Sequence, residues 1–215
     1  MAVTVKICGV NSAEAARAAA EAGAGLVGFV FYAPSPRFVT AEQAAGLAAL
    51  IPAGVLKVGL FVDAGDADIA RMKERVALDM LQLHGAETPS RVAEVKARFG
   101  LPVMKAVPIA AAADVEAAKA FETVADRLLF DAKPPKTMVG ALPGGNALAF
   151  DWQLLSGRRW KAPWMLSGGL TAENLAEAVR ISGARAVDVS SGVEDRPGHK
   201  DPTRIRAFLA AAKGL

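Results

Sequence analysis

Side chains able to take part in acid–base chemistry or anion binding stand at or just after the ends of apolar runs along this 215-residue chain. They are Cys8, Ser35, Arg37, Asp63, Gln82, His84, Lys105, Asp131, Ser167, Asp188 and Ser190. Groups that follow successive buried strands meet at one face when the strands are parallel and form a barrel, and catalytic residues occupy that face. In such a fold these side chains would be candidates for chemistry, although their position alone is not specific to a function.

Cys8 and Asp131 each stand at the end of a buried run, where a reactive or a purely structural role is possible. Cys8 is the only cysteine, at the end of VTVKIC, and a buried free cysteine often serves only as a small apolar side chain. Asp131 directly follows the apolar run LLF, where a charge costs free energy unless it is paired or used. A functional role for Asp131 and a structural one, as a helix cap or a partner for Lys133 or Lys105, are equally open at this point.

Three further polar residues also have plain structural interpretations, which come first for Asp63 and His84. Asp63 precedes Ala64-Gly65-Asp66, so a turn or N-cap role comes first. His84, in LQLHG, is one of two histidines, and no second ligand lies at a spacing that suits a metal. Arg37, in APSPRFV, could be an ordinary surface arginine, but its planar fork suits a carboxylate.

Two glycine- and serine-containing segments indicate an anion site. LSGGL contains Gly168 and Gly169, and VDVSSG contains Ser190 and Ser191. Each segment follows one of the last two predicted strands, where phosphate commonly binds in a (β/α)₈ barrel. Small residues let backbone N–H groups approach an anion, so we predict phosphate binding here rather than two simple turns.

The elements that must position these residues alternate between apolar runs and amphipathic segments. Near-continuous runs such as VGFVF are typical of strands buried on both faces of a parallel sheet. The predicted strands are Val3–Cys8, Leu26–Phe31, Leu56–Val62, Met80–Leu83, Pro102–Val107, Arg127–Asp131, Pro163–Ser167 and Ala186–Ser190. The predicted helices, with their caps, are Ser12–Ala22, Thr40–Leu50, Thr88–Phe99, Ala112–Val124, Thr171–Ile181 and Asp201–Lys213.

Eight such units in a chain of this length predict an α/β fold, a single (β/α)₈ TIM barrel over residues 1–215. A doubly wound open sheet is the alternative, but no early G-x-G-x-x-G motif supports a dinucleotide site. The Pro- and Gly-rich stretch 133–149 follows the sixth strand and is expected to be a functional loop.

Composition limits the classes of function. Hydrophobic residues make up 53% of the chain, and the net charge of +3 comes from scattered Lys and Arg rather than a basic patch, which argues against a nucleic-acid surface. A lone cysteine forms no internal disulfide, which suits a reducing cytoplasm. No segment resembles a signal peptide or a membrane span, so no membrane partner is expected.

The motifs together resemble the phosphoribosylanthranilate isomerase family. The similarity covers almost the whole chain and rests on VKICG, GFVFYAPSPRFV, VGLFVD, LQLHG, LFDAK, FDW, LSGGL and VDVSSGVE, in that order. It implies a (β/α)₈ isomerase of tryptophan biosynthesis. The implied reaction is an Amadori rearrangement of N-(5′-phosphoribosyl)anthranilate to 1-(2-carboxyphenylamino)-1-deoxy-D-ribulose 5-phosphate. The implied enzyme uses no cofactor or metal and is a monomer or homodimer.

The resemblance also implies a role for each site residue. Cys8 would be the general base, Asp131 the general acid, and Arg37 the ligand of the anthranilate carboxylate. The phosphate ligands would be Gly144, Gly145, Gly168, Gly169, Ser190 and Ser191, and Asp188 would be a supporting residue near the substrate. The sixth loop departs from the family's GGTG- or GGSG-like run, since Asn146 and Ala147 follow the two glycines.

Two other functions fit parts of the pattern. The related histidine-pathway sugar isomerase has similar phosphate loops, but it carries an aspartate in place of Cys8 and a clearer two-half repeat. A non-catalytic protein that binds phosphate ligands would not need the pair of Cys8 and Asp131. Both alternatives therefore leave Cys8 unexplained.

Overall fold

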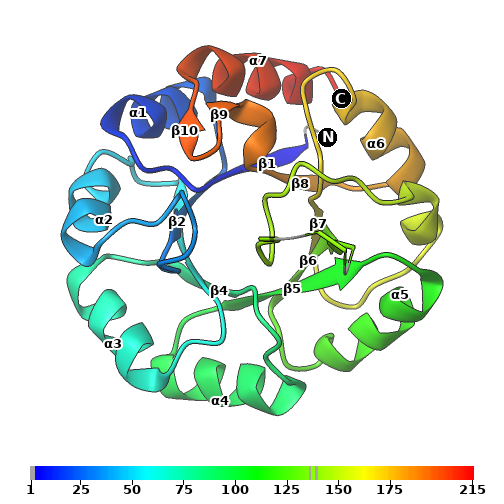
Figure 1. Cartoon of the computed structure of the whole chain (residues 1–215), viewed down its shortest axis with the longest axis horizontal. Coiled ribbons are helices and arrows are strands. Elements are labelled where there is room, and N and C mark those ends of the chain that lie inside the picture. Colours follow the sequence, from blue (N-terminus) through cyan, green and yellow to red (C-terminus); the bar gives the residue numbers. More distant parts are fainter. Residues whose placement is uncertain (1–2, 136, 139) are drawn as a thin grey trace.

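The computed structural model describes residues 3–135, 137–138 and 140–215. Eight parallel strands form a closed barrel in the order β1 to β8, so the predicted fold is confirmed. Figure 1 shows this ring of strands inside a ring of helices. The strands are β1 Thr4–Cys8, β2 Leu26–Val30, β3 Leu56–Phe61, β4 Met80–Leu83, β5 Val103–Ile109, β6 Arg127–Ala132, β7 Trp164–Leu166 and β8 Ala186–Val189.

The outer helices begin and end largely where the capping residues predict. The α-helices are α1 Ala13–Ala22, α2 Ala41–Ala48, α3 Asp66–Arg75, α4 Pro89–Phe99, α5 Ala112–Ala118, α6 Leu175–Ser182 and α7 Pro202–Lys213. Ser12 accepts a hydrogen bond from Ala15 N at the start of α1, and Gly23 ends that helix at φ 93°. The predicted helix Ala112–Val124 is shorter, because a 3₁₀ turn, η1 Lys119–Phe121, follows α5.

Helix α3, a β-hairpin and two 3₁₀ turns were not predicted from the sequence. Helix α3 is highly charged and buries one side chain, Ile69, so its hydrophobic periodicity is weak. A small antiparallel hairpin, β9 Glu194–Arg196 and β10 His199–Lys200, follows the 3₁₀ turn η3 Ser191–Val193. The turn η2 Trp152–Leu155 stands in place of a regular helix between β6 and β7.

Alternation along each strand divides the apolar residues into two cores. One side packs on the helices; the Ala-rich face of α1, for example, joins Val27 and Phe29 of β2 in the larger core. The other side fills the barrel interior with a separate cluster, Leu26, Val58, Met80, Met104, Ala106, Leu129, Met165 and Ala186. This cluster closes the interior beneath the cleft, so the barrel is a packed support rather than a pore.

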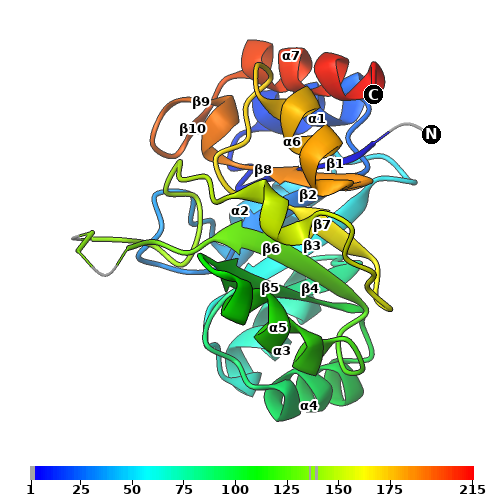
Figure 2. The same ribbon diagram turned by 90° about the vertical axis from the view of Figure 1, so that its right-hand side faces the viewer.

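The loops at one end of the barrel are long enough to enclose a site. In Figure 2 the loop after β6, the loop after β2 and the β9–β10 hairpin extend from the same end. The predicted loop 133–149 lies here, and its residues 136 and 139 are outside the described residues. No helix in the described ranges has the length and apolarity needed to cross a bilayer.

Candidate active site

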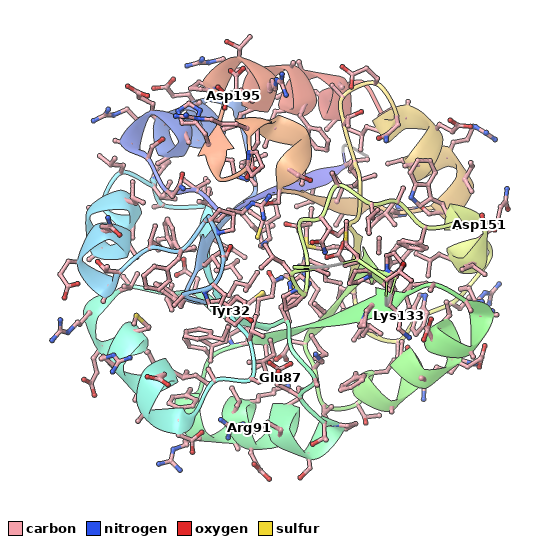
Figure 3. The ribbon with its side chains drawn as sticks, viewed as in Figure 1. Tyr32, Glu87, Arg91, Lys133, Asp151 and Asp195 are labelled. Atoms are coloured by element: carbon pink, nitrogen blue, oxygen red, sulfur yellow. The ribbon has the colours of Figure 1, made fainter. Side chains whose placement is uncertain are left out.

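Cys8 and Asp131 come from different sides of the barrel and line one cleft at its loop end. Cys8 is the last residue of β1, and Asp131 is the penultimate residue of β6. Each is only 5% exposed. Tyr32 and His84 line the same cleft, and Tyr32 lies near the middle of the ring whereas Arg91 and Asp151 lie at its rim (Figure 3). The two candidate proton-transfer groups therefore share one enclosed space.

Asp131 ends a short chain of polar side chains. His84 Nε2 is 3.2 Å from Asp131 Oδ2, and Gln82 Nε2 is 3.0 Å from His84 Nδ1. The backbone N–H of Ala132 donates to Asp131 Oδ1 at 2.9 Å. A Cβ at Gly144 would lie 2.6 Å from Asp131 Oδ2, so only glycine lets the sixth loop pass so close. The carboxyl group is thus fixed in direction by two strands and one loop.

Among the residues that the structure describes, the side-chain carbonyl oxygen of Gln82 is buried without a hydrogen-bond partner. Rotating the amide by half a turn would present this oxygen to His84 Nδ1. With its proton on Nδ1, His84 could then accept a hydrogen bond at Nε2 from the protonated form of Asp131. The Gln82–His84 pair can therefore form a hydrogen bond with either the carboxylate or the carboxylic acid form of Asp131.

Arg37 is held in place by Glu194, which was not among the predicted residues. Its Nε lies 2.7 Å from Glu194 Oε1 and its Nη2 lies 2.9 Å from Glu194 Oε2, a bidentate pair. Arg37 Nη2 also donates to the carbonyl oxygen of Gly145 at 3.1 Å. Both charged side chains are almost fully buried. Arg37 also contributes to the cleft lining.

Lys200 joins this ion pair to the eighth loop. Its Nζ lies 2.5 Å from Glu194 Oε1 and 2.9 Å from the carbonyl oxygen of Ser190, and it also contacts the Ser190 hydroxyl. Burial lowers the pKa of Lys200 to about 8, although the Glu194 carboxylate opposes this shift. The sequence motifs predicted an anion site without lysine, so this buried cation from the β9–β10 hairpin is an addition.

The predicted phosphate segments lie together. Gly168 and Gly169 have φ values of 90° and 62°, which other residues rarely adopt. A Cβ at Gly169 would meet the backbone of Leu148 at 2.8 Å, and one at Gly192 would meet Leu170 O. The loops that follow β6, β7 and β8 are therefore in contact at these glycines. Gly168, Gly169, Ser190 and Ser191 line the same cleft as Cys8.

Asn146 closes the unusual sixth loop on itself. Its side-chain oxygen accepts from Leu142 N at 3.0 Å and its amide donates to Leu142 O at 2.7 Å. Ala147 follows with φ 56°, in the left-handed region that glycine occupies more easily. The departure from the family's run is thus accommodated by an Asn-bridged turn that keeps Gly144 and Gly145 in the cleft lining.

Lys6 and Asp188 form a buried ion pair beneath Cys8. Lys6 Nζ is 2.8 Å from Asp188 Oδ1, and Ser167 Oγ donates to Asp188 Oδ2 at 3.2 Å. Burial lowers the pKa of Lys6, but the charges of Asp188 and Cys8 outweigh it and the net pKa is raised. Burial raises the pKa of the Cys8 thiol, with Lys6 as the largest opposing influence.

The sequence predicted Cys8, Asp131 and Arg37 as site residues, but it did not predict the charged residues that contact the site, which are Lys6, Glu194 and Lys200. Lys6 was available as a charged residue two positions before Cys8 in a buried strand, and therefore on the same face. Glu194 and Lys200 had no comparable signal, because they lie in a short polar hairpin. Asp63 is in a turn at φ 47° and accepts from Ala86 N, but it does not cap α3, whose N-cap is Gly65.

Within the described ranges, no three His, Cys, Asp or Glu side chains gather as a metal site would require. His199 lies on the exposed hairpin beside Asp195, away from His84 in the cleft. The polar groups of the cleft are instead a thiol, a carboxylate, an arginine, and backbone amides with hydroxyls. Together they suit proton transfer on an anionic molecule with two charged ends.

Comparison with known proteins identifies close relatives. The family model described as N-(5′-phosphoribosyl)anthranilate (PRA) isomerase matches residues 5–211. The N-(5′-phosphoribosyl)anthranilate isomerase of Rhodospirillum centenum is 61% identical over 215 residues, covering 100% of both chains. The crystal structure of the Thermotoga maritima phosphoribosyl anthranilate isomerase is 37% identical, with a TM-score of 0.88, and covers 99% of this chain and 100% of that one.

A further solved phosphoribosyl anthranilate isomerase contains a ligand. It is in complex with reduced 1-(o-carboxyphenylamino)-1-deoxyribulose 5-phosphate. It is 36% identical, with a TM-score of 0.85, and covers 99% of this chain and 100% of that chain.

Proposed function

Because the chain belongs to the N-(5′-phosphoribosyl)anthranilate isomerase family, we propose that Cys8 and Asp131 are the general base and general acid of its isomerisation. The enzyme acts in tryptophan biosynthesis, and its reaction is the Amadori rearrangement of phosphoribosylanthranilate. The observation that carries the assignment is the meeting of this thiol and this carboxyl group in one cleft. The whole chain would act as one barrel domain.

Asp131 is suited to the first proton transfer. Opening of the furanose ring requires a proton on the ring oxygen, and a carboxylic acid can supply it. Gln82 and His84 hold Asp131 from one side, and the Ala132 N–H holds its other oxygen. The acid form can be accommodated here, because His84 can accept as well as donate.

Cys8 is suited to the second transfer. Ring opening yields a protonated Schiff base, which acidifies the hydrogen on C2′ of the sugar. A thiolate at Cys8 removes that hydrogen, and the resulting enaminol tautomerises to the ketone. Since acid and base come from β6 and β1, they can act on different atoms of one sugar.

The charged ends of the substrate fix its position between these groups. Arg37 would bind the anthranilate carboxylate, with Glu194 orienting its guanidinium. Gly144, Gly145, Gly168, Gly169, Ser190 and Ser191 would surround the phosphate, and Asp188 would support the sugar side of the site. Holding both ends converts the proton transfers into steps within one bound complex.

Arg37→Ala should weaken binding together with catalysis. The guanidinium contacts the carboxylate in the ground state and in the transition state, so its loss raises KM and Kd. A charge-assisted contact contributes about 1.5–3 kcal/mol, or roughly 10–150-fold in affinity for a product analogue. Calorimetric binding and steady-state kinetics measure both quantities.

Arg75→Ala is the matched control, because Arg75 pairs with Glu42 on the exposed surface. Since Arg37 also neutralises Glu194, the thermal unfolding of each variant must be recorded, and Arg37→Lys provides a variant that keeps the charge. Unchanged analogue affinity in folded Arg37→Ala would remove the carboxylate assignment.

Inorganic phosphate or sulfate should bind beside Gly168, Gly169, Ser190 and Ser191. Backbone amides supply most of the donors, and Lys200 Nζ at the Ser190 carbonyl adds a positive charge. A crystal soaked in phosphate should show the anion at these loops. Phosphate bound only elsewhere would contradict the assignment.

Consumption of phosphoribosylanthranilate, followed by fluorescence with the purified protein, tests the activity directly. A non-catalytic binding protein would bind the product analogue without turnover. We also propose a cytoplasmic location, supported by the free thiol Cys8, and a monomer or homodimer whose partner is a small phosphorylated substrate.

A further inference from the structure

Lys6 is the largest fully buried side chain that bears a charge. It lies on β1 two residues before Cys8, so both side chains point into the barrel. Its relative exposure is 0%, and its Nζ donates to Asp188 Oδ1 at 2.8 Å. An ammonium group has three donors, so the contact with Asp188 leaves donors that can face a neighbouring group.

Stability alone does not account for this ion pair. Removing two charges from water is costly, and well-packed apolar residues often replace such a pair without loss of stability. The apolar cluster that fills the barrel interior offers that type of packing close by. The chain instead places the charges at the base of the cleft, where Asp188 forms part of the lining.

Gly28 shows how close Lys6 comes to the thiol. A Cβ built at Gly28 would lie 3.0 Å from Lys6 Nζ and 3.2 Å from Cys8 Sγ. Gly28 pairs with Cys8 across β1 and β2. The ammonium and the sulfur therefore approach one point on β2, which the missing side chain leaves open.

We propose that Lys6 is a positioning residue whose ammonium, anchored on Asp188, stabilises the Cys8 thiolate and so controls its strength as a base. The inference rests on the proposed role of Cys8. A cation beside a thiol favours the thiolate, and the effect is larger where water is excluded. The electrostatic influences on Cys8 agree, since burial raises its pKa and Lys6 is the largest influence that lowers it.

The other charged groups near Cys8 act in both directions. Asp188 on β8 raises the pKa of the thiol and Lys200 on β10 lowers it, each less strongly than Lys6. Asp131, His84 and Arg37 line the same cleft from β6 and from the loops after β4 and β2. Lys6 is distinguished from these groups by its position on the strand of Cys8 and its contact with Asp188.

The first test removes the pair as a unit in Lys6→Met/Asp188→Asn, because a lone buried carboxylate could prevent folding. Cys8 is the only cysteine, so the pH dependence of alkylation by iodoacetamide in the unliganded enzyme reports this thiol alone. We expect its apparent pKa to rise by about one unit, the low end for loss of a nearby opposite charge. The rise of kcat/KM with pH should move by the same amount.

Gly28→Ala provides a second variant that keeps every charge. Its methyl group would lie against both Lys6 Nζ and Cys8 Sγ and should raise the thiol pKa without changing net charge. Lys57→Met is the matched control, because Lys57 lies on β3, pairs with Asp79 and does not line the cleft. Its thiol titration should match the wild type.

An unchanged thiol titration in both folded variants at Lys6 and Gly28 would overturn the proposal. So would a loss of turnover that is equal at every pH, because that is the result of a purely structural role. Failure of the base assignment gives a different result: Cys8→Ser would then keep its turnover while the alkylation data still decide the role of Lys6.

Discussion

Cys8→Ser should lose turnover by roughly 10²–10⁴-fold, the usual contribution of a general base. The hydroxyl preserves the shape of the side chain but does not ionise near neutral pH. Cys8 lies among Val30 and Leu60 in a small apolar cluster, which a serine can occupy with little rearrangement. Steady-state kinetics should show the loss in kcat, while affinity for a product analogue stays close to the wild type.

The pH dependence of the wild type should identify the base. Burial raises the pKa of the Cys8 thiol above its ordinary value, so the thiolate is the minor form at neutral pH. Below that pKa the thiolate fraction rises tenfold per pH unit, and kcat/KM should rise with it as long as proton abstraction limits the rate. This increase should be absent in Cys8→Ser.

Near-wild-type turnover in Cys8→Ser would contradict the assignment. Cys8 would then be a buried small apolar side chain, and another base would have to be found. His84 is the first candidate, because it lines the same cleft. Analogue binding serves as the control, since lost binding would show that the serine had disturbed the site as a whole.

The strands were predictable because strands buried on both faces of the sheet are near-continuous apolar runs in the sequence. Each predicted strand matches the structure within two residues at either end. Helix α3 was missed because only Ile69 among its residues is buried, so charge rather than periodicity dominates its sequence. The β9–β10 hairpin was missed because it is short and polar, and its pairing depends on the loops that surround it.

Within the site, position at a strand end was the informative feature. The structure places Cys8 and Asp131 in one cleft. Strand-end position included both among eleven polar residues but did not assign their roles, which came from the resemblance to the isomerase family. It could not select Glu194 or Lys200, whose importance comes from contacts with Arg37 and Ser190 that only the folded chain creates. His84 was weighed as a structural residue, yet it contacts Asp131, because the fourth and sixth strands converge on the same cleft.

Asp131→Asn should also reduce kcat by roughly 10²–10⁴-fold, because the amide keeps the size of the carboxyl group but cannot deliver the proton. The substitution should be well tolerated structurally. The asparagine oxygen can accept from Ala132 N, and its NH₂ can then face His84 Nε2. Rotation of Gln82 would allow His84 to accept that hydrogen bond, so no buried donor is left without a partner.

His84→Asn distinguishes the proton donor from its support. If Asp131 is the acid, loss of the imidazole removes one contact that orients it and should cost about tenfold, well below the loss in Asp131→Asn, since the Ala132 N–H still holds the carboxyl group. Single-turnover kinetics should place the defect of Asp131→Asn before proton abstraction, in ring opening. A deeper loss in His84→Asn than in Asp131→Asn would instead make the imidazole the donor, with Asp131 serving to hold its tautomer.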